Sequence, residues 1–270
     1  MQISGKRIVI TGAASGIGKA LLELLSEIPE TRIVAADLKA ETIPAQVGRV
    51  YPLCCDLSTQ EGTDLIIRHA IDVMGGVDLY IANAGFAYYE QLPVGADWKR
   101  LEKIYSTNVL TPIYSFQKVR ELAAGKPFRV VVTASAMGYL AIPGYAIYGA
   151  TKASLVSFAD AFRWELKDPC ALTLLNPIAT RTSFFRQGKS DAPLPFPSQT
   201  PEYVAHYVLR AIQADQPNIF PSKIFRLTLL LNRILPLVGW VYQYYQNWIL
   251  RRWTAKKEAE ASSRSCDQSA

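Results

Sequence analysis

The sequence predicts an α/β fold, a doubly wound parallel sheet of about seven strands with a helical extension appended at its C-terminal end. Short β-branched runs alternate with longer amphipathic segments along most of the chain, which is typical of β-α-β units. A glycine-rich turn at residues 11–18 joins the first such run to the first helical segment. The 270 residues, half of them hydrophobic and 19% charged, fit one large folded domain and exclude disorder for most of the chain.

Seven segments are predicted to be strands, because each is a short aliphatic or β-branched run close to turn-forming residues. They are residues 7–11, 32–36, 49–53, 77–82, 128–134, 171–175 and 218–220. Five longer segments follow the helical period, and Pro112 predicts a kink in the third. They are residues 17–28, 59–74, 97–124, 145–166 and 201–214.

We expect three parts along the chain. Residues 1–221 hold all of these elements and form the predicted Rossmann-type domain. Residues 222–253 form an amphipathic helical extension, and residues 254–270, which are polar and small, form a disordered tail. Within the domain, residues 183–200 are rich in Pro, Ser and Phe, which predicts a lid or a binding loop.

The formal net charge of +6 is a property of the C-terminal region. Residues 219–257 contain seven Lys or Arg side chains and no Asp or Glu. Because this charge lies in an apolar helical region and not on a polar basic face, we expect no nucleic-acid partner.

The four cysteines predict neither a disulfide framework nor a metal site. Cys54 and Cys55 are adjacent, Cys170 lies in an apolar run, and neither these nor Cys266 belong to a C-x-x-C pair with partner histidines. Since the first strand runs straight into the glycine turn, the N-terminus offers no apolar segment of a cleavable signal. We therefore expect reduced thiols and a cytoplasmic domain.

The glycine turn predicts a phosphate-binding site. Gly12, Gly16 and Gly18 would let the backbone approach a pyrophosphate, with Ser15 and Ile17 between them at the positive end of the first helix. Its spacing departs from the common G-x-G-x-x-G form, so the turn alone is weak evidence.

Asp37 strengthens the prediction, because it ends the second strand 19 residues after Gly18, where a carboxylate can accept hydrogen bonds from ribose hydroxyls and repel a 2′-phosphate. Without the glycine turn, Asp37 would be taken for a solvated loop acid.

Two further groups follow strands at the edge of the sheet where open α/β folds bind ligands. They are Asp56-Leu57 and Asn83-Ala84-Gly85. Taken singly, such residues are more often turn or cap residues than ligand contacts.

Tyr148 and Lys152 are four residues apart and lie on one face of a predicted helix. A tyrosine with a pKa near 10 is a poor base at neutral pH, and an adjacent cation would favour the phenolate. Ser135, at the end of the fifth strand, can donate a hydrogen bond to a substrate oxygen. In isolation, a Tyr-Lys pair on a helix would be taken for a surface aromatic-cation contact.

Together these motifs resemble the short-chain dehydrogenase/reductase family over about residues 5–220. The matching positions are residues 11–18, Asp37, Asp56, Leu57, residues 83–85, Asn108, Ser135, Tyr148 and Lys152. The resemblance implies that Tyr148 is the general acid/base, that Ser135 orients the carbonyl or hydroxyl, and that Lys152 holds the nicotinamide ribose and lowers the pKa of Tyr148. It implies that Asn108 organises a water in a proton relay. Asp37 favours NAD over NADP, although Lys39 lies only two positions beyond it.

The resemblance extends past the sixth strand with two departures. Pro177, Thr180 and Thr182 match positions that would contact the cofactor, but Ile178 stands where the family has glycine and Thr180 where it has an aliphatic residue. Ala82 stands where the family typically has Asn, and we attach little weight to this difference.

Apolar and aromatic side chains recur at three- and four-residue steps from Ile224 to Ile249, broken at Pro236 and Gly239, which predicts two amphipathic helices. The uncharged run at residues 234–250 contains Pro, Gln and Asn and is marginal for a membrane span. A helix pair lying on a membrane surface fits better. A cap over the substrate pocket and a subunit interface are the alternatives.

We therefore expect an NAD-dependent oxidoreductase that interconverts a secondary alcohol and a ketone on a small apolar substrate, of the lipid, steroid or retinoid kind. Phe184 and Phe185 are predicted to contact that substrate beside Ser135 and Tyr148. The alternatives are an NADPH-dependent reductase of a lipid ketone such as 3-ketosphinganine, and a non-catalytic NAD-binding scaffold or sensor. A homo-oligomer, a dimer or a tetramer, is expected.

Overall fold

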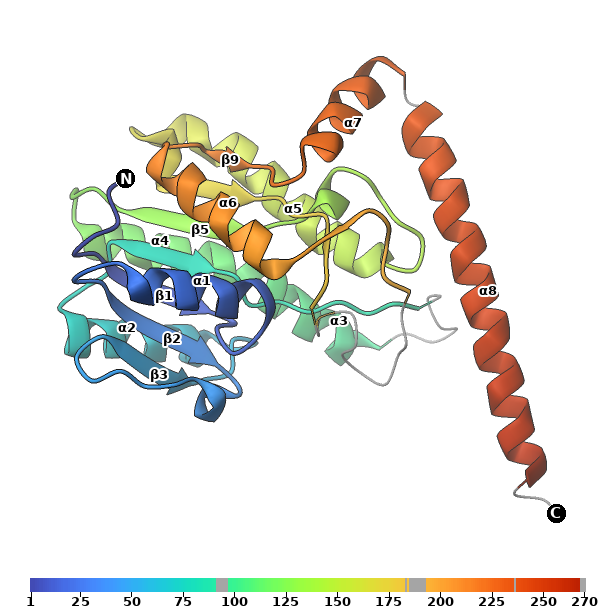
Figure 1. Ribbon diagram of the computed structural model, residues 1–270, viewed down its shortest axis with the longest axis horizontal. Helices are drawn as coiled ribbons and strands as arrows, with labels where there is room; N and C mark the ends of the chain where they lie inside the picture. Colours follow the sequence, from blue (N-terminus) through green and yellow to red (C-terminus); the bar gives the residue numbers. More distant parts are fainter. Residues whose placement is uncertain (91–96, 183, 185–192, 236, 268–270) are drawn as a thin grey trace.

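The computed structural model describes residues 1–90, 97–182, 184, 193–235 and 237–267. Its main sheet is fully parallel and has seven strands in the order β3-β2-β1-β4-β5-β6-β9 (Figure 1). The strands are β1 (Arg7–Thr11), β2 (Arg32–Asp37), β3 (Val50–Cys54), β4 (Leu79–Ala82), β5 (Arg129–Thr133), β6 (Leu172–Leu175) and β9 (Asn218–Ile219). This confirms the predicted fold class, and each strand lies within two residues of its predicted bounds. Pro52 is tolerated in β3 because that strand is at the edge of the sheet.

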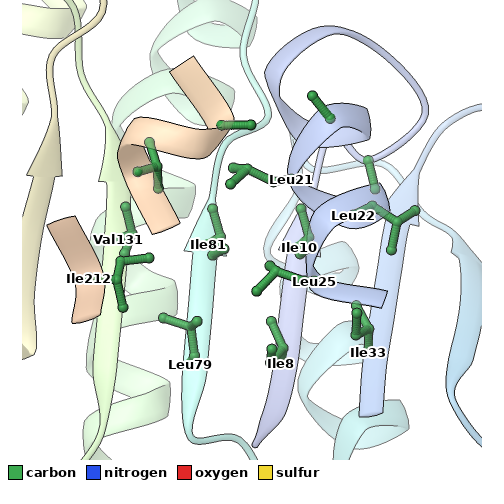
Figure 2. Packing of buried hydrophobic residues seen from close by; sticks show 14 of the residues in the cluster. Ile8, Ile10, Leu21, Leu22, Leu25, Ile33, Leu79, Ile81, Val131 and Ile212 are labelled. Carbon is green, nitrogen blue, oxygen red and sulfur yellow. The ribbon is translucent and has the colours of Figure 1, made fainter. Parts of the chain in front are cut away.

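Helices cover both faces of this sheet. The helices of the domain are α1 (Gly16–Glu27), α2 (Gln60–Met74), α3 (Trp98–Tyr105), α4 (Thr111–Ala123), α5 (Ala146–Phe162) and α6 (Pro201–Gln213). Alternate residues of one strand point to opposite faces: Ile8 and Ile10 of β1 pack with α1 and α6, whereas Val9 packs on the side of α2, α4 and α5. Figure 2 shows the first of these layers, in which Leu21 and Leu25 of α1 lie over β1 and β4. Both faces of the sheet are therefore core, and a functional site is left to the ends of the strands.

The helix predicted at 97–124 is two helices joined by a π-helical turn, Ser106–Leu110. Pro112 has no N–H to donate to the carbonyl of Asn108, so the hydrogen-bond pattern changes one turn before the proline. The predicted kink is thus a π turn, and Asn108 lies in its middle.

A second, two-stranded sheet pairs β7 (Ala179–Thr180) with β8 (Ser198–Gln199). β8 lies inside the segment predicted to be irregular, so the end of that loop is tied to the strand-like segment that follows Pro177. Residues 185–192 and 183 of the predicted lid are outside the described residues.

The C-terminal extension forms two helices, α7 (Lys223–Ile234) and α8 (Leu237–Asp267), as predicted. In Figure 1, α8 is the long red helix beside the domain. Its length corrects the prediction of a disordered tail, since residues 254–267 continue the helix. These residues include three Ala, two Glu and two Lys, which favour helices, and Lys256 and Lys257 both pair with Glu260. Among the described residues, no helix is both long and apolar enough to cross a bilayer.

Candidate active site

A cavity of about 980 Å³ lies at the carboxyl ends of the central strands. Its walls come from the glycine turn, the ends of β2 to β6, the start of α5, and residues of α7 and α8. The predicted site residues that line it are Gly12, Ser15, Gly16, Ile17, Asp37, Asp56, Leu57, Asn83, Ala84, Gly85, Ser135, Tyr148, Lys152, Pro177, Thr180, Thr182 and Phe184. Gly18 and Asn108 lie behind this wall, and Phe185 is outside the described residues.

The glycine turn packs too tightly for side chains. A Cβ on Gly18 would lie 2.0 Å from the carbonyl oxygen of Gly12, and one on Gly12, whose φ is +68°, would lie 3.0 Å from Cα of Ala84. The Ser15 side chain caps none of the first N–H groups of α1, and the first turn of that helix has no acidic residue. The result is a backbone cradle at the positive end of a helix, which fits the pyrophosphate of a dinucleotide.

Asp37 is held beside this cradle by two backbone hydrogen bonds. Its carboxylate accepts one from the N–H of Ala14 and one from the N–H of Lys39, each at 3.0 Å. The carboxylate therefore faces the cavity in one fixed orientation, where it can accept hydrogen bonds from a ribose.

Thr11 connects the turn to the segment after β4. Its hydroxyl accepts hydrogen bonds from the N–H groups of Asn83 and Ala84, at 3.0 and 3.1 Å, and the Asn83 amide donates back to the carbonyls of Thr11 and Gly12. Asn83 thus acts mainly as a clamp between two loops of the cavity. Asp56 instead accepts the N–H of Ser58, and this hydrogen bond lowers the pKa of the Asp56 carboxyl.

The three predicted catalytic side chains converge at the other end of the cavity. Ser135, at the N-cap of a short 3-10 turn, accepts the N–H of Met137 at 3.1 Å, which leaves its hydroxyl hydrogen for another acceptor. Lys152 donates to the carbonyl of Thr133 at 2.7 Å, and its Nζ lies 5.6 Å from the centre of the Tyr148 ring. Tyr148 and Lys152 share one face of α5, as their spacing predicts.

Burial dominates the protonation of this pair. Burial raises the pKa of Tyr148 to about 12, against a smaller lowering by its hydrogen bond with Ser135. Burial also lowers the pKa of Lys152 to about 7. The net direction for the pKa of Tyr148 is upward, because the loss of hydration outweighs the hydrogen bond with Ser135. That Lys152 lowers the pKa of Tyr148 stays a prediction. At neutral pH Tyr148 is a phenol that can donate a proton.

Asn108 supports the cavity wall from behind. Its fully buried side chain accepts the N–H of Phe86 at 3.1 Å and donates to the carbonyl of Phe86 at 2.9 Å and to the hydroxyl of Thr151 at 3.2 Å. Asn108 therefore links the π turn, the segment after β4 and α5. Its part in a proton relay stays a prediction.

An aromatic cluster adjoins Tyr148 and includes residues of the C-terminal helix. Tyr148 contacts Phe184 and Tyr145 edge to face, Tyr145 contacts Tyr89, and Tyr89 contacts Trp253 of α8 with ring centres 5.0 Å apart. Leu250 of α8 is buried in the same cluster.

Several residues at the apolar end of the cavity were not predicted from the sequence. They are Met137, Leu140, Ile142, Pro195, Pro197, Ile224, Phe225, Thr228 and Tyr242. Ile224 and Tyr242 belong to the apolar pattern of the extension, but nothing in that pattern tells which of its residues reach the cavity. Tyr242 also donates from its hydroxyl to the carbonyl of Phe196 at 3.0 Å, so α8 is tied to the loop before β8.

Comparison with known proteins matches residues 6–192 to the family model described as short chain dehydrogenase. Retinol dehydrogenase 10-B of Danio rerio is 27% identical over 280 residues, covering 90% of this chain and 82% of the relative. Estradiol 17-beta-dehydrogenase 11 of Rattus norvegicus is 25% identical over 247 residues, covering 87% and 81%. An uncharacterised oxidoreductase of Listeria monocytogenes is 32% identical over 175 residues, covering 61% and 69%.

Solved structures share the fold. A short chain dehydrogenase/reductase from Burkholderia phymatum in complex with NAD superposes with a TM-score of 0.75 and 22% identity, over 86% of this chain and 94% of that one. A short chain dehydrogenase from Burkholderia cenocepacia in complex with NADP has a TM-score of 0.77 and 20% identity, over 90% and 99%. Since the family model covers more than half of the chain, and the Ser, Tyr and Lys side chains meet in one cavity, the protein belongs to the short-chain dehydrogenase family and is an oxidoreductase that acts on CH–OH groups with a nicotinamide cofactor.

Proposed function

We propose that the protein is an NAD-dependent oxidoreductase that interconverts a secondary alcohol and a ketone on an apolar substrate of the lipid, steroid or retinoid kind. The observation that supports this most is the position of Tyr148, which lines the cavity between the polar cofactor cradle and an apolar wall. A substrate with one polar atom would put that atom at Tyr148 and Ser135 and its hydrocarbon part against this wall.

The roles of the protein groups follow from their hydrogen bonds. Tyr148, neutral at pH 7, donates its proton to a substrate carbonyl in the direction of reduction, and in the direction of oxidation it must first lose that proton. Ser135, whose oxygen is already occupied by the N–H of Met137, donates its hydrogen to the same substrate oxygen. Lys152, anchored on Thr133, is placed to bind a ribose hydroxyl. When bound, the nicotinamide supplies or accepts the hydride, and its oxidised form adds a positive charge that favours the Tyr148 phenolate.

The preference for NAD is supported by Asp37. Its carboxylate is fixed at the cradle end of the cavity, where it favours ribose hydroxyls and repels the 2′-phosphate of NADP. The two Burkholderia structures do not decide between the cofactors, because one is a complex with NAD and the other a complex with NADP.

The apolar substrate class is supported by the far wall of the cavity. Leu140, Ile142, Phe184, Phe225 and Tyr242 line it. Two similar proteins are named for retinol and estradiol, which are alcohols with large hydrocarbon skeletons.

The second candidate is an NADPH-dependent reductase of a lipid ketone such as 3-ketosphinganine. It is favoured by Lys39, which lines the cavity two residues beyond Asp37 and whose cation could meet a 2′-phosphate. A non-catalytic scaffold is disfavoured, since the Ser, Tyr and Lys side chains all stand at the cavity.

The test is a cofactor and substrate screen with the full chain in mild detergent. Reduction of NAD⁺ and of NADP⁺ is followed at 340 nm with long-chain secondary alcohols, sterols and retinol, and with 2-propanol as the short control. We expect the largest kcat/KM with NAD⁺ and a long or polycyclic alcohol. A preference for NADP⁺ would move the assignment to the lipid-ketone reductase, and equal kcat/KM for 2-propanol and the long alcohols would remove the apolar substrate class.

A further inference from the structure

The C-terminal helices expose an unusual amount of apolar surface. Among the described residues, 11 of the 23 exposed large hydrophobic side chains lie between Ile224 and Trp248. They occur on α7, on α8 and at the corner between them, where Leu235 is 59% exposed and Leu237 64%. We call this set the outer face. We propose that the outer face docks the enzyme on the surface of an anionic phospholipid bilayer, with the mouth of the cavity beside the lipid.

α8 has two apolar sides, and only one of them is covered. Tyr242, Gln246, Leu250 and Trp253 recur at steps of four, four and three residues and face the domain, where Gln246 and Leu250 are buried. Trp240, Tyr244 and Trp248 recur at steps of four on another side and are 63, 69 and 47% exposed. Packing against the domain therefore explains the first stripe, whereas the rings of the second stripe contact other side chains of α8 and stay largely exposed.

α7 shows the same imbalance. Phe225 is its buried anchor, whereas Leu227 and Leu231, four residues apart, are 57% and 44% exposed. A hydrogen bond from the N–H of Gly239 to the side chain of Asn232, at 2.9 Å, holds the two helices at their corner. Both helices thus contribute exposed apolar side chains to one hairpin.

The exposed Lys and Arg side chains around the outer face favour an anionic partner. Lys223, Arg226, Arg251 and Arg252 are exposed, and none of them forms an ion pair with a described residue. Since residues 219–257 contain no acid, a second copy docked through the same face would bring these cations together unneutralised. Anionic lipid headgroups would neutralise them.

The aromatic residues suit the boundary between lipid and water. Trp and Tyr combine a large apolar ring with one polar group, and they concentrate at the headgroup level of membranes. The guanidinium of Arg252 lies 4.0 Å from the centre of the Trp248 ring, so cation and ring already form one amphipathic unit. α8 carries polar Gln243 and Asn247 between its aromatic residues, so we expect it to lie along the surface and not to insert across it.

The cavity opens at the edge of the outer face. Ile224 both lines the cavity and is 68% exposed, and Phe196, whose carbonyl accepts the Tyr242 hydroxyl, is 76% exposed beside the lining residues Pro195 and Pro197. An apolar substrate leaving the bilayer would therefore enter without crossing water. Entry of the substrate from the bilayer rests on the proposed substrate class, whereas docking of the protein on the bilayer does not.

The test is co-sedimentation of the full chain with vesicles of phosphatidylcholine and phosphatidylglycerol (7:3), compared with pure phosphatidylcholine, in the absence of substrate. We expect binding to the anionic vesicles that weakens with salt. The double variant Trp240→Ser/Tyr244→Ser is expected to lower the bound fraction at least tenfold, because both rings lie on the outer face. Arg226→Gln and Arg251→Gln should each weaken anionic binding by about fivefold.

Trp164→Ser is the matched control, because Trp164 is 92% exposed but lies near the amino ends of β6 and β9, whereas the cavity lies at the carboxyl ends of the strands. Its neighbour Arg163 donates to the carbonyls of Leu172 and Pro217. It is expected to sediment like the wild type. The proposal is overturned if the wild type stays in the supernatant with anionic vesicles, or if the double variant binds as well as the wild type. Vesicle-independent dimers that the double variant dissociates, with no vesicle binding, would make the outer face a subunit interface. Since no turnover is measured, failure of the proposed substrate class would leave these results unchanged.

Discussion

The side chain of Asn108 bonds both backbone polar groups of Phe86, accepting its N–H at 3.1 Å and donating to its carbonyl at 2.9 Å. Asn108 reaches this position from a π-helical turn, and Phe86 follows Gly85, which lines the cavity. A deviation in helix geometry thus supports a loop of the active site, in keeping with the frequent occurrence of π turns at functional sites.

Asn108→Ala is expected to leave both polar groups of Phe86 without their partner. We expect a loss of about 3 kcal/mol in the free energy of unfolding and weaker cofactor binding, since the wall at Gly85 is no longer held. Urea unfolding and titration of NADH fluorescence measure the two effects. Asn108→Asp, which keeps the acceptor and loses the donor, should lie between wild type and Ala; an Ala variant as stable as the wild type would contradict the bracing role.

Tyr148→Phe is expected to lower kcat by at least about a thousandfold, because the proton donor is removed from the reacting oxygen. NADH binding should stay close to that of the wild type, since the ring remains. Tyr145→Phe is the matched control: it removes another buried phenol, whose ring centre lies 6.3 Å from that of Tyr148, but one that does not line the cavity. Similar losses of kcat in the two variants would show that packing, not proton transfer, is the role of Tyr148.

Asp37→Asn is expected to raise kcat/KM for NADP⁺ by about tenfold, because the variant removes the charge that opposes a 2′-phosphate. The amide keeps an oxygen that can accept the N–H of Ala14 or Lys39, so the fold of the turn should survive. Kinetics with NAD⁺ and NADP⁺ on one substrate give the ratio. No change in that ratio would mean that Asp37 does not face the ribose.

The lowered pKa of Lys152 predicts that the free energy of unfolding depends on pH. Its pKa is about 7 in the fold and about 10.4 in an unfolded chain. Between these values the unfolded state binds more protons, so the contribution of Lys152 to the free energy of unfolding rises with pH by at most about 1.4 kcal/mol per pH unit. Below pH 7 the folded protein carries the full penalty of a buried charge.

Lys152→Met removes this titration. The free energy of unfolding of the variant minus that of the wild type should be most positive near pH 6 and should fall steadily up to pH 10. Urea unfolding of both proteins at each pH unit measures it. A difference independent of pH would show that Lys152 keeps its ordinary pKa in the fold.

Gly18→Ala is expected to abolish dinucleotide binding. Its Cβ would lie 2.0 Å from the carbonyl oxygen of Gly12 and 2.7 Å from Nδ2 of Asn83, so the turn must open. Gly149→Ala is the matched control, because Gly149 lies within α5 and its Cβ would meet the carbonyl of Met137 at an ordinary 3.5 Å. It should keep or slightly raise stability. NADH titration and thermal unfolding compare the two, and retained binding in Gly18→Ala would contradict the tight turn.

The local sequence pattern was sufficient to predict much of the fold and much of the chemistry of the site. The strands are short apolar runs whose two faces are both buried, and this composition is visible residue by residue. The spacing of Tyr148 and Lys152 places them on one helix face whatever surrounds that helix. The glycine turn and Asp37 are also recognisable, because their backbone requirements limit which residues can stand there.

Other features depend on what packs against what. Burial, and not the Tyr-Lys spacing, sets the direction of the Tyr148 pKa, and burial is created by side chains distant in sequence such as Phe184. The helical tail and the π turn likewise differ from their predictions.

The sequence by itself therefore determined the α/β architecture, the cofactor cradle and the identity of the reacting side chains, because these follow from short-range periodicity and backbone geometry. Only the tertiary structure decided that Asn108 holds Phe86, that Tyr242 joins the cavity wall, and that one stripe of α8 is covered while the other is exposed. Those contacts connect segments far apart along the chain, and their energy comes from burial and hydrogen bonding that no local pattern specifies.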